Sequence, residues 1–157
     1  MAQFFIDKGR FGFYFDTRAH QYKSKPHAKS VAKFKDKIRT ITSRSNAMSM
    51  ELRYKKLKQT IVGWVNYFKI ANMQKIAQKL DEWIRRRIRM CYWKQWKKIK
   101  TKHDNLTRLG IDDYKAWEFA NTRKSYWRVS NSPILSRSLT NKTLERFGYT
   151  SLSSVYC

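Results

Sequence analysis

Four arginines stand close together in the middle of the chain, at Arg85, Arg86, Arg87 and Arg89. On a helix, Arg85 and Arg89 share one face because residues four apart are neighbours, and the other two spread around most of a turn. Guanidinium groups recognise phosphate oxygens through paired N–H donors. The spacing therefore predicts a ridge that contacts phosphates along one strand or across a groove. The alternative is a solvated helix face without a ligand.

Aromatic residues follow these arginines and alternate with lysines. Exposed rings among cations are typical of proteins that stack unpaired bases. The alternative for Trp93 and Trp96 is burial against the C-terminal part of the chain. Residues 123–128 form a second cluster of this kind, with the same two interpretations. The candidate RNA-binding residues are Lys29, Lys33, Lys37, Arg85, Arg86, Arg87, Arg89, Trp93, Lys94, Trp96, Lys97 and Lys98. The candidate DNA- or RNA-binding residues of the C-terminal part are Arg123, Lys124, Trp127, Arg128 and Arg137.

Residue patterns typical of catalysis are missing. His20, His27 and His103 lie far apart in the sequence, and neither cysteine has a partner at metal-ligand spacing. Two-metal phosphoryl transfer needs clustered carboxylates. The adjacent acidic pairs at 81–82 and 112–113 are interpreted as helix caps and local charge pairs. We expect no catalytic residue and no metal site, so the sequence by itself argues against an enzyme.

The composition points to a polyanionic partner. The chain has 157 residues, and its 35 Lys and Arg against 11 Asp and Glu give a net charge of +24. Hydrophobic residues make up 41%, which is enough to bury a core and argues against a disordered basic tail. Because the charge alternates with apolar residues at helical spacing, it lies on the outer faces of folded elements. Nucleic acid is the expected partner, and an anionic membrane surface is the alternative.

Targeting and redox signals are weak. No apolar run reaches the ~18 residues of a membrane span, and the first residues lack the basic region of a signal peptide. Two cysteines cannot form a disulfide framework, so a reducing compartment is favoured. These observations predict a cytoplasmic protein with no membrane partner. The family resemblance described below implies that the cytoplasm is bacterial.

The first 100 residues predict a hairpin and three helices. Residues 11–15 with 21–22 are typical of a short β-hairpin that ends before Pro26. Ser30, Ser49 and Asn72 are expected to cap the helices that follow. Apolar residues then recur at helical spacing, and Gly63 inside the second helix indicates close helix–helix contact. The expected apolar faces are Val31, Phe34, Ile38 and Ile41, then Met50, Tyr54, Leu57, Ile61, Trp64 and Phe68, then Met73, Ile76, Leu80, Trp83, Ile84, Ile88 and Cys91.

The C-terminal part predicts shorter helices after a linker at residues 100–103. Leu106 and Leu109 before Gly110 indicate one helical turn. Asp112 is expected to cap another helix, and Ser132 to cap a helix with proline at its first position. Asn141 is expected to cap a last helix that ends at Gly148. The predicted fold is mainly α: residues 1–25 form the hairpin, 26–100 a three-helix bundle, and 101–157 a small helical module.

Three segments resemble a known family. Residues 63–68 (Gly-Trp-Val-Asn-Tyr-Phe), 80–90 and 93–98 closely resemble the maturase-specific region of bacterial group II intron reverse transcriptases. Residues 131–136 (Asn-Ser-Pro-Ile-Leu-Ser) resemble the C-terminal module of the same proteins. The resemblance covers about residues 11–157.

The resemblance implies a fold and a role for each part. The three helices would be the thumb, also called the X or maturase domain, which grips template–primer and binds the intron RNA to assist splicing. The module after it would be the D domain, which is linked to target DNA. Residues 11–15 resemble the end of the polymerase palm. Residues 8–10 depart from the family pattern, where only Phe11 agrees with it, and residues 1–10 resemble a substitute start. The metal-binding Tyr-x-Asp-Asp motif of the palm is absent from this sequence.

We therefore expect the C-terminal portion of such a protein, which binds structured intron RNA without catalysing polymerisation. One alternative is a subunit of a split RNA-directed DNA polymerase that acts with a separately encoded palm, which would bring Mg²⁺ with it. Another is a non-functional remnant. No cofactor is expected for the chain alone, and target DNA is a further expected partner.

Overall fold

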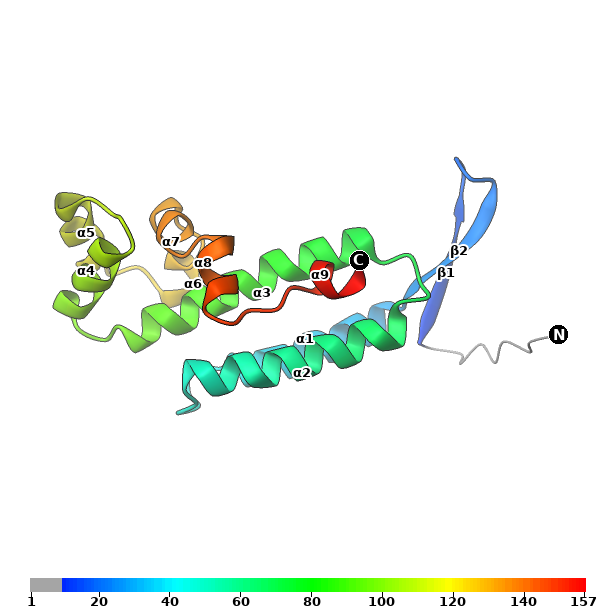
Figure 1. Ribbon diagram of the computed structural model, residues 1–157, viewed down its shortest axis with the longest axis horizontal. Coiled ribbons are helices and arrows are strands. Elements are labelled where there is room, and N and C mark those ends of the chain that lie inside the picture. The colour runs from blue at the N-terminus through cyan, green and yellow to red at the C-terminus, as the bar shows by residue number, and fades with distance from the viewer. Residues whose placement is uncertain (1–9) are drawn as a thin grey trace.

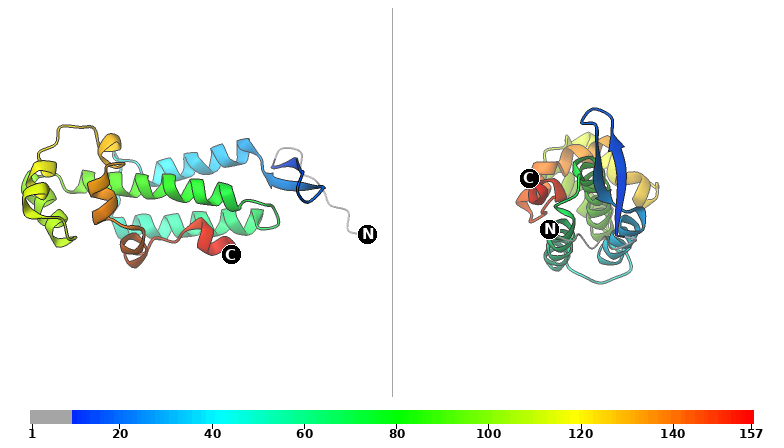
Figure 2. Two further views of the ribbon diagram at one scale, coloured as in Figure 1. Left: turned by 90° about the horizontal axis from the view of Figure 1, so that it is seen from above. Right: turned by 90° about the vertical axis from the view of Figure 1, so that its right-hand side faces the viewer.

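The computed structural model describes residues 10–157, which form an elongated, mainly helical molecule with an N-terminal hairpin (Figure 1). The substitute start expected at residues 1–10 falls almost entirely outside the described residues. The hairpin projects from one end of the molecule, and α4 and α5 lie at the other end (Figures 1 and 2). The predicted fold class, a short hairpin followed by helices, is confirmed.

The hairpin pairs β1 (Phe11–Asp16) with β2 (Gln21–Pro26) as antiparallel strands, with Phe11 opposite Pro26 and Asp16 opposite Gln21. The Asp16 carboxylate accepts the backbone N–H groups of Arg18 and Ala19, which fixes the turn. At the base, the Phe11 ring packs edge-on against Phe68, with 5.0 Å between the ring centroids. The hairpin is therefore anchored at one end and free to extend away from the helices at the other.

Three long helices follow: α1 (Ala28–Ile41), α2 (Met50–Phe68) and α3 (Gln74–Gln95). Ser49 caps α2 as predicted, because its side chain accepts the N–H of Leu52. The other two expected caps are wrong. His27 caps α1, which leaves Ser30 inside the helix, and Met73 stands at the start of α3 without a side-chain cap. The Asn72 amide instead donates to the Tyr14 hydroxyl and so ties the hairpin to the bundle.

The predicted apolar faces of these helices meet in one core. On α2 the residues Tyr54, Leu57, Ile61 and Phe68 are buried as expected, while Val65 is fully buried and Trp64 only partly. The prediction for Gly63 is wrong: it lies on the surface, and a Cβ atom there would meet nothing within 4 Å. Tight helix packing therefore does not explain this glycine.

A buried arginine organises the loop between α1 and α2. Arg53 is 4% exposed, and its guanidinium donates to the backbone carbonyls of Ile41, Ser43, Asn46 and Met48. These bonds satisfy carbonyls at the end of α1 and in the loop, which would otherwise lack partners. Sequence reasoning did not single out Arg53.

The rest of the chain forms six short helices: α4 (Ile99–Arg108), α5 (Asp113–Ala120), α6 (Tyr126–Val129), α7 (Pro133–Ser138), α8 (Asn141–Arg146) and α9 (Leu152–Tyr156). The linker expected at residues 100–103 is wrong, because these residues lie within α4. The cap of α7 at Ser132 is confirmed, whereas α8 is capped by Thr140 rather than Asn141. Gly110 and Gly148 follow the ends of α4 and α8 with φ of 91° and 113°, as the predicted stops require.

The C-terminal segment folds back along α3, so that α9 lies near the hairpin end of the molecule (Figure 1). Its side chains share one continuous core with the three long helices, from Phe34 to Leu152. The Tyr156 hydroxyl donates to the carbonyl of Ala71 at 2.9 Å. The expected boundary at residue 100 thus falls inside a helix, and the C-terminal part packs on the bundle. Within residues 10–157, no helix is long and apolar enough to cross a bilayer.

Candidate nucleic-acid interface

A basic groove lies between α1 and α2, beside the hairpin. Lys29, Lys33 and Lys37 stand four residues apart and exposed on one face of α1, where they form one wall. Gln59 and Thr60 of α2 stand opposite. Three lysines at this spacing cover about 12 Å of helix, comparable to the rise over about three to four phosphates of one duplex strand. The structure therefore brings together three of the predicted RNA-binding residues.

The floor of this groove is aromatic and open. The Trp64 ring packs between Phe34 and Phe68, with ring-centroid distances of 4.7 and 4.9 Å. Next to it, Gly63 lines the groove without a side chain. The groove encloses about 840 Å³, and none of its lining residues in the described part of the chain is acidic. A chain with phosphates could approach the backbone at Gly63 closely while lysines neutralise its charge.

Trp64 carries an unused hydrogen-bond donor. Its indole Nε1 is buried and has no hydrogen-bond partner among the described residues. A buried N–H without an acceptor costs about 1–3 kcal/mol. Arg10 also borders the groove and donates to the Tyr67 hydroxyl at 2.9 Å. Sequence reasoning placed Trp64 in the core stripe and did not connect Gly63, Trp64 and Tyr67 with the lysines of α1.

The predicted phosphate ridge on α3 is largely occupied by contacts within the chain. Arg86 lies 3.8 Å from the centre of the Trp127 ring and donates to the Trp127 carbonyl at 3.0 Å. Arg89 donates to the Leu139 carbonyl at 3.0 Å. Both guanidiniums hold the C-terminal segment against α3.

Arg87 contacts the end of α1 rather than the C-terminal segment. Its Nε donates to the Thr42 hydroxyl at 2.6 Å, at the end of α1. Desolvation by burial lowers the pKa of Arg87 and of Arg89 from the usual arginine value. Three of the four arginines therefore bind carbonyl and hydroxyl oxygens of the protein, which the sequence interpretation as a phosphate ridge did not foresee.

Arg85 differs from its three neighbours. Among residues 10–157, it makes no side-chain hydrogen bond or ion pair, and it borders a hollow of about 550 Å³ together with Lys79 and Asn131. Arg85 and Lys79 are thus cations of α3 that remain available to a phosphate.

A comparison with protein-family models matches residues 31–110 to the group II intron, maturase-specific domain. The chain belongs to this family. The matched segment begins in α1, ends just after α4, and contains the lysines of the groove except Lys29. A search of curated proteins finds no match.

The two tryptophans near the end of α3 are part of the core of the maturase domain. Trp93 is 1% exposed and Trp96 is 8% exposed. Trp93 packs against Phe119, with 5.4 Å between centroids, and the Lys102 ammonium lies over the Trp93 ring at 4.7 Å. Both rings are therefore buried against the C-terminal part, as the alternative interpretation stated. The prediction that they form an exposed stacking platform is wrong. Lys97 and Lys98 are exposed, and the Lys94 ammonium lies 5.3 Å from the Tyr126 ring.

The second predicted cluster lies at the surface of the C-terminal part. Arg123, Lys124, Arg128 and Arg137 are exposed. Trp127 is 36% exposed, and one face of its ring is covered by Arg86. The structure brings Arg86 and Trp127 together, although their sequence positions gave no signal for this pairing.

His103 is held between two carboxylates in the maturase domain. Its Nδ1 lies 3.0 Å from Asp104 and its Nε2 lies 2.7 Å from Asp113, while its ring stacks on Trp117 at 3.9 Å. The hydrogen bond to Asp104, followed by that to Asp113, raises the pKa of His103. Within residues 10–157, no group of three or more His, Cys, Asp or Glu side chains could hold a metal ion.

Proposed function

We propose that the protein binds structured RNA of a group II intron and assists its splicing as a maturase, without catalysing polymerisation. One observation carries the proposal: a groove without acidic lining, walled by Lys29, Lys33 and Lys37, lies in a chain of the group II intron maturase-specific family. Such RNA is made in the bacterial cytoplasm, where we place the protein.

Electrostatics explains what bound protein would do for the RNA. A folded intron packs phosphate backbones closely, and their repulsion opposes folding. Cations that replace the condensed counterions reduce this repulsion and gain free energy from ion release. With a net charge of +24, the chain supplies these cations on a folded surface. No group on the protein needs to react, because its contribution is to position the RNA.

The experiment is a titration of labelled group II intron RNA at several salt concentrations. We expect the triple variant Lys29→Gln, Lys33→Gln, Lys37→Gln to bind more weakly and to reduce the salt slope by about 2 to 3, since each neutralised phosphate contributes about 0.7–0.9. The matched control replaces the exposed Lys100, Lys115 and Lys142 by Gln, which removes the same charge elsewhere. Equal losses in the two variants, or stronger binding to anionic vesicles than to RNA, would contradict the proposal.

The exposed basic residues of the C-terminal part support a second contact with nucleic acid. We propose that Arg123, Lys124, Arg128 and Arg137 contact target DNA or a further segment of RNA. Changing all four to Gln should lower affinity for a DNA duplex. An unchanged affinity would remove them from the interface.

The hairpin supports a second candidate function, docking on a polymerase palm. Phe13, Phe15 and Tyr22 are 52%, 49% and 76% exposed, and Phe15 and Tyr22 contact each other. Exposed aromatic groups on a projecting strand pair are typical of a surface that binds another polypeptide. Any Mg²⁺ chemistry would come with that palm. We expect Phe13→Ser with Phe15→Ser to abolish co-purification with a group II intron palm polypeptide and to leave RNA binding intact.

A further inference from the structure

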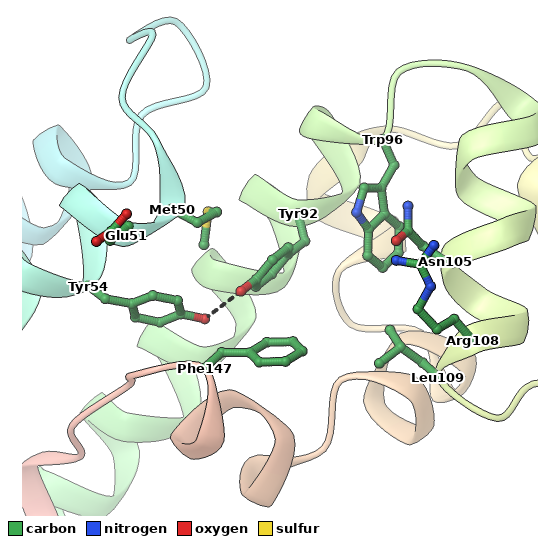
Figure 3. Close-up of a pocket in the computed structure, with 9 residues that line it drawn as sticks. All are labelled: Met50, Glu51, Tyr54, Tyr92, Trp96, Asn105, Arg108, Leu109 and Phe147. Carbon is green, nitrogen blue, oxygen red and sulfur yellow. Dashed lines mark hydrogen bonds between the residues drawn. The ribbon is translucent and has the colours of Figure 1, made fainter.

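We propose that a second pocket, formed by α2, α3, α4 and the end of α8, takes up a single unpaired base of the bound RNA. The inference rests on the proposed function and adds a site at the opposite end of α2 from the hairpin. The pocket encloses about 370 Å³, within the range of small-molecule sites. Nine residues line it (Figure 3): Met50, Glu51, Tyr54, Tyr92, Trp96, Asn105, Arg108, Leu109 and Phe147.

The rings of Tyr92 and Phe147 supply the stacking surfaces, and the buried Trp96 lines the pocket beside them. The Tyr92 ring lies 6.0 Å from that of Phe147 and 6.1 Å from that of Trp96, at angles of 52° and 45°. In Figure 3, the rings of Phe147 and Tyr92 lie next to each other, and Trp96, Asn105, Arg108 and Leu109 face them across the pocket. Phe147 is 42% exposed although it is large and apolar. A planar base that enters here would cover this ring, and stacking of this kind does not depend strongly on base identity.

Polar groups with unused capacity distinguish a base from an apolar protein side chain. The Tyr54 and Tyr92 hydroxyls are 3.0 Å apart, so one of them donates to the other. The hydroxyl that accepts this bond keeps its own proton, which has no acceptor among the described residues. Burial raises the pKa of both phenols, so both keep their protons near neutral pH. The Asn105 amide nitrogen donates to the Thr101 carbonyl, which leaves its Oδ1 as an acceptor.

The rim of the pocket adds a positively charged hydrogen-bond donor and a negatively charged acceptor. Arg108 and Glu51 are both exposed at the pocket. The edge of a base carries donors and acceptors together, whereas an apolar side chain would leave these groups unpaired at a cost in free energy. Arg146 lies over the Phe147 ring at 5.7 Å, which places a further cation beside the opening for the phosphates that flank the base.

The pocket depends on the fold of the C-terminal segment. Phe147 is contributed by the end of α8, and the turn at Gly148 packs against Tyr54, since a Cβ atom on Gly148 would lie 3.7 Å from the Tyr54 Cβ. The other lining residues come from the segment that matches the family model. The site therefore forms only where the C-terminal segment folds back on α2 and α3.

The experiment uses the full chain and two RNA hairpins. One hairpin is fully paired, and the other carries one additional unpaired nucleotide whose base is the fluorescent 2-aminopurine. We expect the bulged hairpin to bind about tenfold more tightly than the paired one, with quenching of the fluorescence by stacking. Phe147→Ala should remove the difference and the quenching. Phe13→Ala, a control at a similarly exposed phenylalanine of the hairpin, should retain both. Tyr54→Phe, which keeps the ring and removes one hydroxyl, should lower only the affinity for the bulged RNA.

The outcomes separate this inference from the proposed function. If neither hairpin binds, the proposed function fails and the pocket inference fails with it. If both bind equally, in a salt-dependent way and without quenching, RNA binding stands and the pocket inference is overturned. The pocket inference is also overturned if Phe147→Ala weakens binding of the paired and bulged hairpins alike. It is overturned, too, if Phe13→Ala removes the difference in affinity and the quenching as Phe147→Ala does. Circular dichroism spectra should show that all variants are folded.

Discussion

The carboxylate of Asp81, in the first half of α3, accepts a 2.7 Å hydrogen bond from the backbone N–H of Leu152, the first residue of α9. The same carboxylate accepts bonds from the Ser153 N–H, the Ser153 hydroxyl and the Tyr149 hydroxyl. One buried acid thus caps the last helix of the chain from another helix, where the positive end of the helix dipole favours it. This bond network fixes the C-terminal segment along α3.

Replacement of this acid should destabilise the fold. Asp81→Ala leaves buried donors at Tyr149 and Leu152, and partly buried donors at Ser153, without an acceptor. We therefore expect a loss of about 3 kcal/mol in the free energy of unfolding. Urea denaturation measures it. The control is Glu82→Ala at the exposed neighbour, which should change stability by about 0.5 kcal/mol or less. Equal effects of the two substitutions would show that the network contributes nothing.

The arginines of α3 should separate into two classes. Arg89→Ala removes a bond to the Leu139 carbonyl and leaves that oxygen without its partner, so we expect a loss of about 1–3 kcal/mol in unfolding free energy. Arg85→Ala should leave stability within about 0.5 kcal/mol and lower RNA affinity instead. Thermal unfolding and RNA titration on the same samples check both statements. A stable Arg89 variant with weakened RNA binding would restore the phosphate-ridge interpretation.

Stability should depend on pH through His103. Its pKa is raised in the fold, above the unfolded value of about 6.5. The protonated ring therefore stabilises the pairing of α4 with α5 fully below the unfolded pKa, and this contribution is lost as the pH rises through the folded pKa. Unfolding midpoints measured from pH 6 to 9 should fall, and the fall should be smaller in His103→Gln. A titration by NMR that places the His103 pKa at or below about 6.5 would contradict this prediction.

The glycine in the groove should show opposite effects on stability and binding. Gly63 lies inside α2 with open space where a Cβ would stand, so Gly63→Ala should stabilise the protein by about 0.5–1 kcal/mol. A methyl group would also occupy the floor of the groove, so RNA affinity should fall. Urea denaturation and RNA titration give the two numbers. Gly148→Ala is the contrasting variant, because its φ of 113° should make the same substitution destabilising.

The helices were predictable where periodicity, a capping residue or a glycine close in the sequence determines them. Strong periodicity in residues 50–68 and the hydroxyl of Ser49 gave α2, and the glycines at 110 and 148 gave the ends of α4 and α8. The helices α6 and α9 have only four and five residues, too few for a periodic pattern. They are held by tertiary contacts such as those of Asp81, whose partners lie about 70 positions away in sequence.

The basic residues of the candidate interface were predictable from the sequence, whereas the contacts that they make in the fold were less so. Lys29, Lys33 and Lys37 follow from their spacing on one helix, since four residues return to the same face. The arginines of α3 misled because a guanidinium binds a carbonyl as readily as it binds a phosphate, and the carbonyls at Trp127 and Leu139 are distant in sequence. The aromatic floor of the groove was missed because Trp64 fits the apolar stripe of the helix and Gly63 was interpreted as a helix–helix contact.

The most direct test of the account is the salt-dependent affinity for group II intron RNA, compared between the wild-type chain and the Lys29, Lys33, Lys37→Gln triple variant. The account predicts tight binding that weakens steeply with salt, and a slope smaller by about 2 to 3 in the variant. The same affinity and the same slope in both proteins would contradict it.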